Sequence, residues 1–90
     1  MIKEVGEMRL ETREKMRGGE GNVVIRHFFE KKDFTAEVRL CAQLNLEPGS
    51  SIGMHEHSGE DEIYIVLRGT GLLDDGIVKK KIKAGDAVLT

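Results

Sequence analysis

The sequence has 90 residues, which is the length of one domain with a small hydrophobic core. Hydrophobic residues make up 39% and charged residues 33%, which excludes a disordered chain, and no apolar run approaches the length of a membrane-spanning helix. Fourteen basic and sixteen acidic residues give a net charge of −2, so the basic surplus of a nucleic-acid-binding protein is missing.

Cysteine content and the N-terminal residues indicate the compartment. The single cysteine, Cys41, has no partner for an internal disulfide, which is typical of proteins from reducing compartments. The N-terminal residues alternate acids and bases and contain no apolar stretch of the kind that a secretory signal needs. We therefore expect a cytoplasmic protein.

The first 21 residues are rich in charge and contain only scattered apolar positions. Their pattern favours an N-terminal arm or a short helix without a complete apolar stripe. A glycine-rich run at residues 18–21 ends this segment. The expected division is therefore an arm or short helix at residues 1–21 and one β domain at residues 22–90.

From residue 22 onward the sequence is typical of short β-strands separated by turns. Glu37–Leu46 alternates apolar and polar residues, so one side of this strand is apolar. Asp75-Gly76 is the dipeptide that a two-residue type I′ hairpin turn favours. Seven strands at this spacing predict an antiparallel sandwich or barrel. The predicted strands are Asn22–Phe29, Glu37–Leu46, Ile52–His57, Glu62–Arg68, a strand that begins at Leu72, Ile77–Lys83 and Ala87–Thr90.

Two of the three histidines, His55 and His57, lie two positions apart in the predicted strand Ile52–His57. Alternate residues of a strand project from the same face, with Cα atoms about 6.5–7 Å apart. A four-residue loop then makes His57 and Glu62 opposite partners in the predicted hairpin, and opposite partners share a face. Two imidazoles and one carboxylate are therefore expected to point to one place.

This donor set favours one divalent transition metal, namely Mn, Fe, Ni, Zn or Cu, over Ca or Mg, which prefer shells made only of oxygen. The alternative is that His55 and His57 are surface residues or a satisfied polar pair, because His-x-His on a half-exposed strand is common without a metal. The predicted register of Glu62 favours the metal interpretation.

Five residues at fixed spacings carry a family resemblance. They are Gly49, His55, His57, Glu62 and Gly69. Their pattern, G-x5-H-x-H-x4-E-x6-G, resembles the first conserved motif of the cupin superfamily. Ala84–Val88 is also similar to a segment of small single-domain cupins, and the resemblance covers about residues 22–90.

The resemblance implies an all-β, antiparallel jelly-roll β-barrel of the cupin type, with His55, His57 and Glu62 as three of the four usual metal ligands. The fourth would be a histidine in a second motif that Gly85 can begin, but the sequence ends at Thr90 before that histidine. We therefore expect a barrel domain that lacks the second motif and is incomplete at its C-terminus. A longer chain, a neighbouring chain or a water would supply the missing ligand.

Two further side chains have open interpretations. Tyr64 shares the predicted face of Glu62 and is the candidate catalytic residue, whose hydroxyl would orient a bound carboxylate or sugar. The alternative is a core aromatic residue whose hydroxyl has one partner. His27 is the remaining histidine that could replace the fourth ligand, and the favoured interpretation there is a core or surface histidine.

Ile63, Ile65 and Leu67 lie on the other face of the same predicted strand, which is therefore apolar on both faces. One face is expected to pack inside the barrel and the other against a second sheet or a subunit. Together with the small core, this pattern predicts a homodimer.

The predicted strand Ile77–Lys83 carries four lysines, Lys79, Lys80, Lys81 and Lys83. A solvated strand edge that deters the addition of further strands explains this run. No ligand role is assigned to it.

The resemblance leaves two functions open. The first is a metal-dependent enzyme that acts on a small oxygen-rich substrate (a dicarboxylate, keto acid or sugar derivative) by oxalate-decarboxylase-like or dioxygenase-like chemistry. The alternative is a non-catalytic binding or sensor module with a structural metal or none. A small-molecule ligand is the expected partner, whereas nucleic acid and membranes are not, and the fold alone does not choose between the two functions.

Overall fold

A computed structural model describes residues 1–90, and the chain divides into a first unit, residues 1–53, and a second unit, residues 54–90. All strand pairs are antiparallel, and the helical segments are three short 3-10 turns. None of the helical segments is long and apolar enough to cross a membrane. The strands are β1 (Arg9–Glu14), β2 (Asn22–Phe29), β3 (Cys41–Leu46), β4 (Ile63–Ile65), β5 (Thr70–Asp74), β6 (Lys79–Lys83) and β7 (Ala87–Leu89). The 3-10 turns are η1 (Val5–Glu7), η2 (Met16–Gly18) and η3 (Lys31–Asp33).

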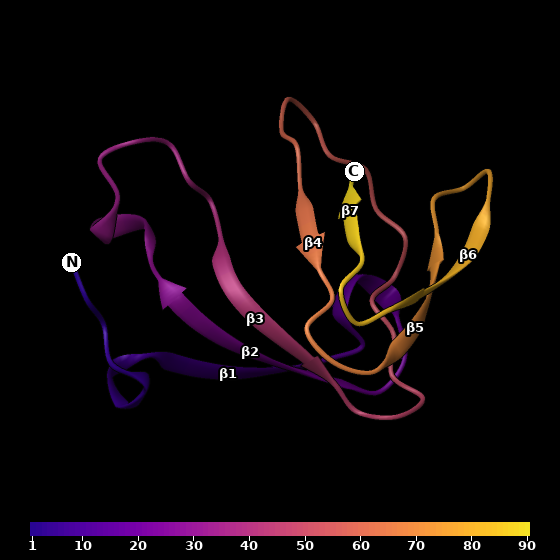
Figure 1. The fold of residues 1–90 in the computed structure, drawn as a ribbon, viewed down its shortest axis with the longest axis horizontal. Coiled ribbons are helices and arrows are strands. Elements are labelled where there is room, and N and C mark those ends of the chain that lie inside the picture. Colours follow the sequence, from indigo (N-terminus) through magenta and orange to yellow (C-terminus); the bar gives the residue numbers. More distant parts are fainter. The chain divides into compact units, whose positions relative to one another are not determined.

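The first unit contains a three-stranded sheet in the order β1-β2-β3 (Figure 1). β2 is the central strand because it pairs with β1 at one edge and with β3 at the other. Every second side chain of β2 is buried, and both Val23 and Ile25 have 0% exposure. The observed bounds of β2 are those predicted from the sequence, and one face of this strand forms the core of the first unit.

The first 21 residues are part of the same sheet. β1 pairs with β2 from Arg9↔His27 to Glu14↔Asn22, and the helical content of this segment is limited to η1 and η2. Where an arm or a short helix was expected, the structure has the strand β1 and two single 3-10 turns. β1 gives no apolar signal because five of its six residues are exposed and none is buried.

The second unit contains two strand pairs, β4 with β7 and β5 with β6. β4 is shorter than the predicted strand Glu62–Arg68, but its ladder is extended by backbone hydrogen bonds at both ends. Glu62 exchanges both backbone hydrogen bonds with Thr90, and Val66 accepts from Gly85 and donates to Asp86. The segment from Glu62 to Val66 is thus held to the chain that begins at Gly85.

The predicted strand Glu37–Leu46 is correct only from Cys41 onward. The β2–β3 ladder has an irregularity between His27 and Phe29, and Phe29 pairs with Cys41 as its last partner. Because β2 ends at Phe29, Glu37–Leu40 has no partner strand in spite of its alternating pattern.

The predicted strand Ile52–His57 is wrong, since none of these residues belongs to a strand. The backbone N–H groups of Ser51 and Gly53 donate to the carbonyl groups of Glu20 and Met16 instead. The predicted hairpin ladder between this segment and Glu62 is accordingly absent, and β4 pairs with β7.

The predicted two-residue turn at Asp75-Gly76 is also wrong. Asp74 and Lys79 are the last paired residues of β5 and β6, so four residues connect the strands. The Asp75 carboxylate accepts hydrogen bonds from the backbone N–H groups of Val78 and Ile77, at 2.7 and 2.9 Å. These bonds lower the pKa of Asp75, with Val78 as the larger cause, and they stabilise the longer loop.

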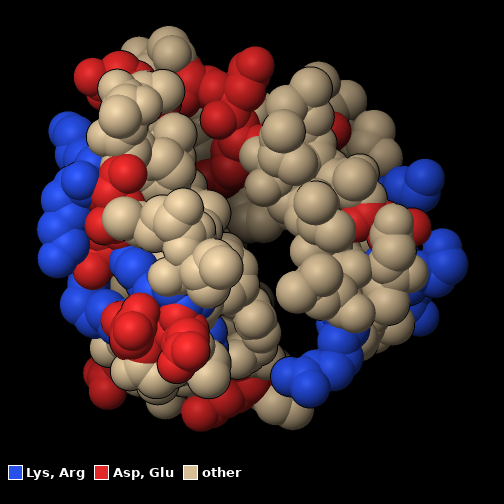
Figure 2. Space-filling model, turned by 60° about the vertical axis from the view of Figure 1, so that its left-hand side comes forward, with Lys and Arg blue, Asp and Glu red and all other residues tan.

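The nearly balanced charge of the chain is seen on its surface. On the face drawn in Figure 2, acidic and basic side chains are interspersed, and neither sign covers the whole face. In the first unit, Lys3 forms an ion pair of 2.7 Å with Asp33, and Arg9 forms one of 2.8 Å with Glu30. Opposite charges are thus locally paired on this unit.

Candidate metal site

Three side chains of the second unit bring potential metal ligands together. His55, His57 and Glu62 each offer one ligand atom, and these atoms all lie within 4.8 Å of one another. All three residues are half-buried, with side-chain exposures of 20% for His57 and 28% for Glu62. The convergence expected from the sequence is therefore present in the structure, although the predicted hairpin ladder is not.

Glu62 is positioned by its backbone. Because its N–H and C=O both bond to Thr90, the start of the β4–β7 ladder fixes the direction of its side chain. Glu62 Oε1 lies 3.3 Å from His57 Nε2, yet it is buried and makes no hydrogen bond. A buried carboxylate oxygen without a partner is costly, and a bound cation would satisfy it.

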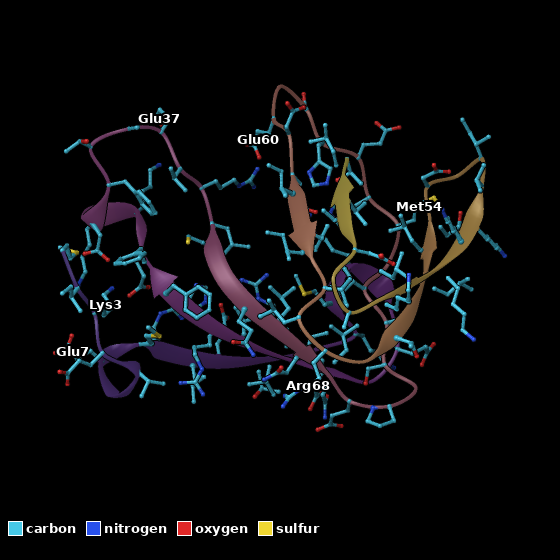
Figure 3. All side chains as sticks on the ribbon, in the orientation of Figure 1. Lys3, Glu7, Glu37, Met54, Glu60 and Arg68 are labelled. Atoms are coloured by element: carbon cyan, nitrogen blue, oxygen red, sulfur yellow. The ribbon has the colours of Figure 1, made fainter.

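The two histidines are kept on one side of an extended segment that is not a strand. Their ring centroids lie 4.8 Å apart, with an angle of 71° between the ring planes. Their neighbours Met54 and Glu56 are exposed, and Met54, labelled in Figure 3, is 66% exposed. The alternation on which the sequence prediction depended therefore persists without a partner strand.

The donor set fits a divalent transition metal. Two imidazole nitrogens and one carboxylate oxygen suit Mn, Fe, Ni, Zn or Cu better than Ca or Mg. The buried, unbonded Glu62 Oε1 is the observation of this structure that supports the fit. Each of the three side chains offers one ligand atom.

Comparison with known proteins identifies the family. The family described as Cupin domain matches residues 42–90, which include all three candidate ligands. The chain belongs to the cupin family. An oxalate-binding protein of Thermotoga maritima is 41% identical to this cupin over 90 residues, which are 100% of this chain and 74% of that protein.

A solved structure supports the same assignment. It is the crystal structure of a predicted oxalate decarboxylase from Thermotoga maritima, with a TM-score of 0.92 and 41% identity. The match covers 100% of this cupin and 78% of that chain. The expected all-β, antiparallel cupin fold is thereby confirmed, as is the resemblance found in the five-residue motif.

Tyr64 lies beside the candidate ligands. It is half-buried in β4 and is two residues from Glu62, so the two side chains share a face. The register partner of Tyr64 is Val88 of β7, and Val88 lines a cavity of about 440 Å³ in the second unit. Neither Tyr64 nor any of the three candidate ligands lines this cavity.

His27 belongs to a different cluster. It is buried in the first unit, and its Nε2 lies 2.6 Å from Glu11 Oε1. This partner accounts for the histidine, in agreement with the interpretation as a core residue.

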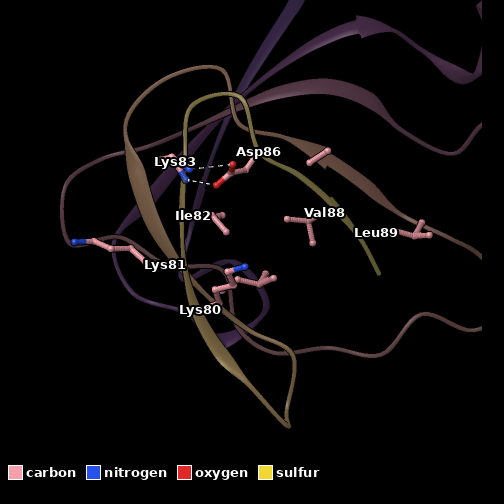
Figure 4. A pocket seen from close by; sticks show the side chains of 9 residues that line it. Lys80, Lys81, Ile82, Lys83, Asp86, Val88 and Leu89 are labelled. Carbon is pink, nitrogen blue, oxygen red and sulfur yellow. Dashed lines mark hydrogen bonds and ion pairs between the residues drawn. The ribbon is translucent and has the colours of Figure 1, made fainter.

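The lining of the cavity includes a residue to which the sequence analysis assigned no role. Lys80 of β6 is one of the lining residues, together with Ile82 on the same face of the strand. Lys80 and Ile82 alternate with Lys81 and Lys83 along β6, and residues of both sets line the cavity (Figure 4). The lining residues are Leu73, Lys80, Lys81, Ile82, Lys83, Asp86, Ala87, Val88 and Leu89.

Proposed function

We propose that this cupin binds one divalent transition metal through His55, His57 and Glu62, and that the ion binds a small dicarboxylate of the oxalate type. The observation that carries the proposal is the convergence of three ligand atoms within 4.8 Å around a buried, unbonded carboxylate oxygen. The ligand class is supported by the oxalate-binding protein that is 41% identical to the chain.

Each side chain has a distinct part in this function. His55 and His57 would supply neutral nitrogen donors, and Glu62 would supply a negatively charged oxygen that offsets part of the charge of the ion. A bound metal would act as a Lewis acid toward a carboxylate. The Tyr64 hydroxyl would donate a hydrogen bond to the ligand and so orient it, since Tyr64 shares the face of Glu62.

Metal titration tests the first part of the proposal. We expect the purified protein to bind Mn, Fe, Ni, Zn or Cu with a stoichiometry of one, and His57→Ala to weaken metal binding at least about tenfold, because a ligand is removed from the ion. Glu56→Ala is the matched control, because Glu56 is exposed and adjacent in sequence but alternates away from the ligands. Equal metal affinity in the wild type and in both variants would contradict the site.

A catalytic version of this function is supported by the similarity to the predicted oxalate decarboxylase. In that reaction a monoprotonated oxalate would give one carbon dioxide and one formate, so the carbon–carbon bond breaks and a proton takes its place. Formate release by the metal-loaded protein, reduced in Tyr64→Phe, would support catalysis. Oxalate binding without formate release would support the non-catalytic binding module instead.

We also propose that two copies of the chain associate through the outer face of β4. Ile63, Ile65 and Leu67 are 71%, 65% and 68% exposed, and Leu89, the register partner of Ile63, is 69% exposed. An exposed row of four apolar side chains with no charged residue among them favours a second copy with the same apolar row.

We propose a cytoplasmic location because the single cysteine is a free thiol. Cys41 is a free thiol on β3. A reducing compartment keeps such a thiol from oxidation. Fractionation of cells that produce the protein, with a periplasmic marker as control, tests this location.

A further inference from the structure

A second cavity, of about 250 Å³, lies in the first unit and is lined in part by β1 and β2. Arg9, Glu11 and Arg13 alternate along β1 and therefore share a face. The register partner of Arg9 is His27 of β2, so this face also carries His27. All four residues line the cavity, and none of the candidate metal ligands does.

The lining of this cavity is rich in positive charge. Four lining residues are cationic and two are carboxylates, which is an excess of two positive charges in a chain whose net charge is −2. A cleft lined mainly by charges of one sign attracts ions of the opposite sign. The cationic residues are Arg9, Arg13, Lys31 and Arg39, and the carboxylates are those of Glu11 and Glu30.

Arg13 is held in place by a carboxylate that is itself anchored. Glu11 Oε1 lies 2.6 Å from Nε2 of His27, a residue that is buried, so the ring fixes the carboxylate. Glu11 then accepts hydrogen bonds from Nε and Nη2 of Arg13, at 3.3 and 3.2 Å. A guanidinium group presents five N–H donors, and Glu11 takes two of them. Arg13 therefore keeps donors for a ligand on a side chain whose direction is already fixed.

Arg9 is held in a similar way. Its Nε donates to Glu30 Oε1 at 2.8 Å, whereas its Nη1 lies 3.8 Å from Glu11 Oε1, beyond hydrogen-bond distance. The side chains of Arg9 and Arg13 are 51% and 46% exposed, so a ligand from solution can reach both. Two guanidinium groups with unused N–H donors thus border one cavity.

We propose that this cavity binds a phosphate group and that Arg9 and Arg13 donate hydrogen bonds to its oxygens. Guanidinium groups recognise phosphate through paired N–H donors. A phosphate monoester carries a charge of about −1.5 to −2 at neutral pH, which offsets the excess positive charge of the lining. The site lies outside the candidate metal site and does not depend on the proposed function.

Calorimetry with inorganic phosphate tests the site in the full chain, at constant ionic strength and with or without a chelator. We expect phosphate binding that the chelator does not change, because no metal ion takes part. Arg13→Gln should weaken phosphate binding about tenfold, because charge-assisted contacts to the anion are lost.

Arg26→Gln is the matched control, because it removes the same charge from the opposite face of the same sheet. Arg26 is the register partner of Leu10, which alternates with Arg9, and it does not line the cavity. Its variant should bind phosphate within about twofold of the wild type. Equal losses in Arg13→Gln and Arg26→Gln would overturn the proposal.

Two further comparisons separate geometry from charge. Arg13→Lys keeps the charge and loses the planar fork, so its phosphate affinity should lie between those of Arg13→Gln and the wild type. Malonate spreads two charges over separate carboxylates and should bind the wild type at least about threefold more weakly than phosphate. Equal affinities for malonate and phosphate would overturn the assignment to phosphate.

Labelling of arginines with phenylglyoxal gives a readout on the wild type that does not require any variant to fold. Phosphate should protect Arg9 and Arg13 and leave Arg17 reactive, since Arg17 is exposed and does not line the cavity. Labelling that phosphate does not change would overturn the proposal, as would a wild type that binds no phosphate. Phosphate binding that the chelator abolishes would assign the anion to a metal ion instead and overturn this site.

Discussion

His27 is a buried ionisable side chain in the first unit, and its environment depends on one acidic neighbour. His27 Nε2 donates to Glu11 Oε1, and Arg13 lies 3.2 Å from the same oxygen. The bond from His27 is the main reason that the pKa of Glu11 is lowered from its ordinary value, followed by the bond from Arg13. Glu11 thus joins β1 to β2 through a side-chain contact in addition to the backbone ladder.

The lowered pKa of Glu11 predicts a pH dependence of stability. A carboxyl group whose pKa is lower in the folded state contributes stability above its ordinary value of 4.5, and this contribution is lost as the pH falls from 4.5 through the lower folded pKa. Glu11→Gln should therefore lower the free energy of unfolding by about 1 kcal/mol at neutral pH, and the difference from the wild type should shrink below pH 4.5.

Urea unfolding between pH 7 and pH 3 measures this difference. Glu14→Gln is the control, because Glu14 is an exposed residue of the same strand without a side-chain partner. If the free energies of unfolding of Glu11→Gln and the wild type differed by the same amount at every pH in this range, ionisation of Glu11 would not be the source of the stability.

At the scale of single residues, the candidate ligands were predictable and the lysines that line the cavity were not. His55, His57 and Glu62 carry a spacing that is informative by itself, because the identity of each residue and the gaps between them are both restricted. Lys80 stands in a run of four lysines, and its direction depends on the register of β6, which becomes known only from its pairing with β5.

At the scale of elements, the turn η2 packs against the segment that leads into the candidate ligands. Gly53 N–H donates to the carbonyl of Met16 at 2.8 Å. A Cβ atom on Gly53 would overlap the carbonyl group of Arg17, and one on Gly19 would overlap the carbonyl group of Ser51. Glycine is therefore required where these two backbones approach.

We expect Gly53→Ala to destabilise the protein by about 2 kcal/mol, because a backbone carbonyl cannot move aside as a flexible side chain can. Thermal unfolding measures the effect. Gly6→Ala serves as the control, since a Cβ at Gly6 would meet no atom within 4 Å. Equal melting temperatures for the two variants would mean that the approach of the two backbones is not as close as described.

Strand prediction failed where it depended on a partner. Glu37–Leu40 and Ile52–His57 both alternate as strands do, but a strand also needs a neighbour with free backbone groups. β2 ends before it can pair with the first segment, and the donors of Ser51 and Gly53 are used by Glu20 and Met16. A single sequence does not show this competition for partners. The Val, Ile and Phe residues of β2 were enough to predict its bounds.

At the scale of the whole molecule, the outer face of β4 predicts association. Replacing Ile65 by lysine should convert a dimer to a monomer, because two buried ammonium groups would oppose each other across a twofold axis. Light scattering at micromolar concentrations measures the mass. Ile77→Lys is the control, since Ile77 is 93% exposed in the loop between β5 and β6. A wild type that stays monomeric at every concentration would exclude this interface.

Membership of the cupin family was predictable from a few residues, although much of the secondary structure around them was not. Gly49 and Gly69 flank the three candidate ligands at the motif spacing, and the family match and the solved structure confirm the assignment. The pairing of β1 with β2 was not predictable, because five of the six residues of β1 are exposed and give no apolar pattern.

The ladder between β4 and β7 has a consequence for the order of folding. β5 and β6 are joined by a short loop and can pair early, whereas Glu62 meets Thr90 only after the whole intervening chain has closed into a loop. The carboxylate is thus fixed in place late, and contacts that form after the transition state act on the rate of unfolding. An ion bound between Glu62 and the two histidines would lengthen the lifetime of the native state and leave the speed of its formation almost unchanged.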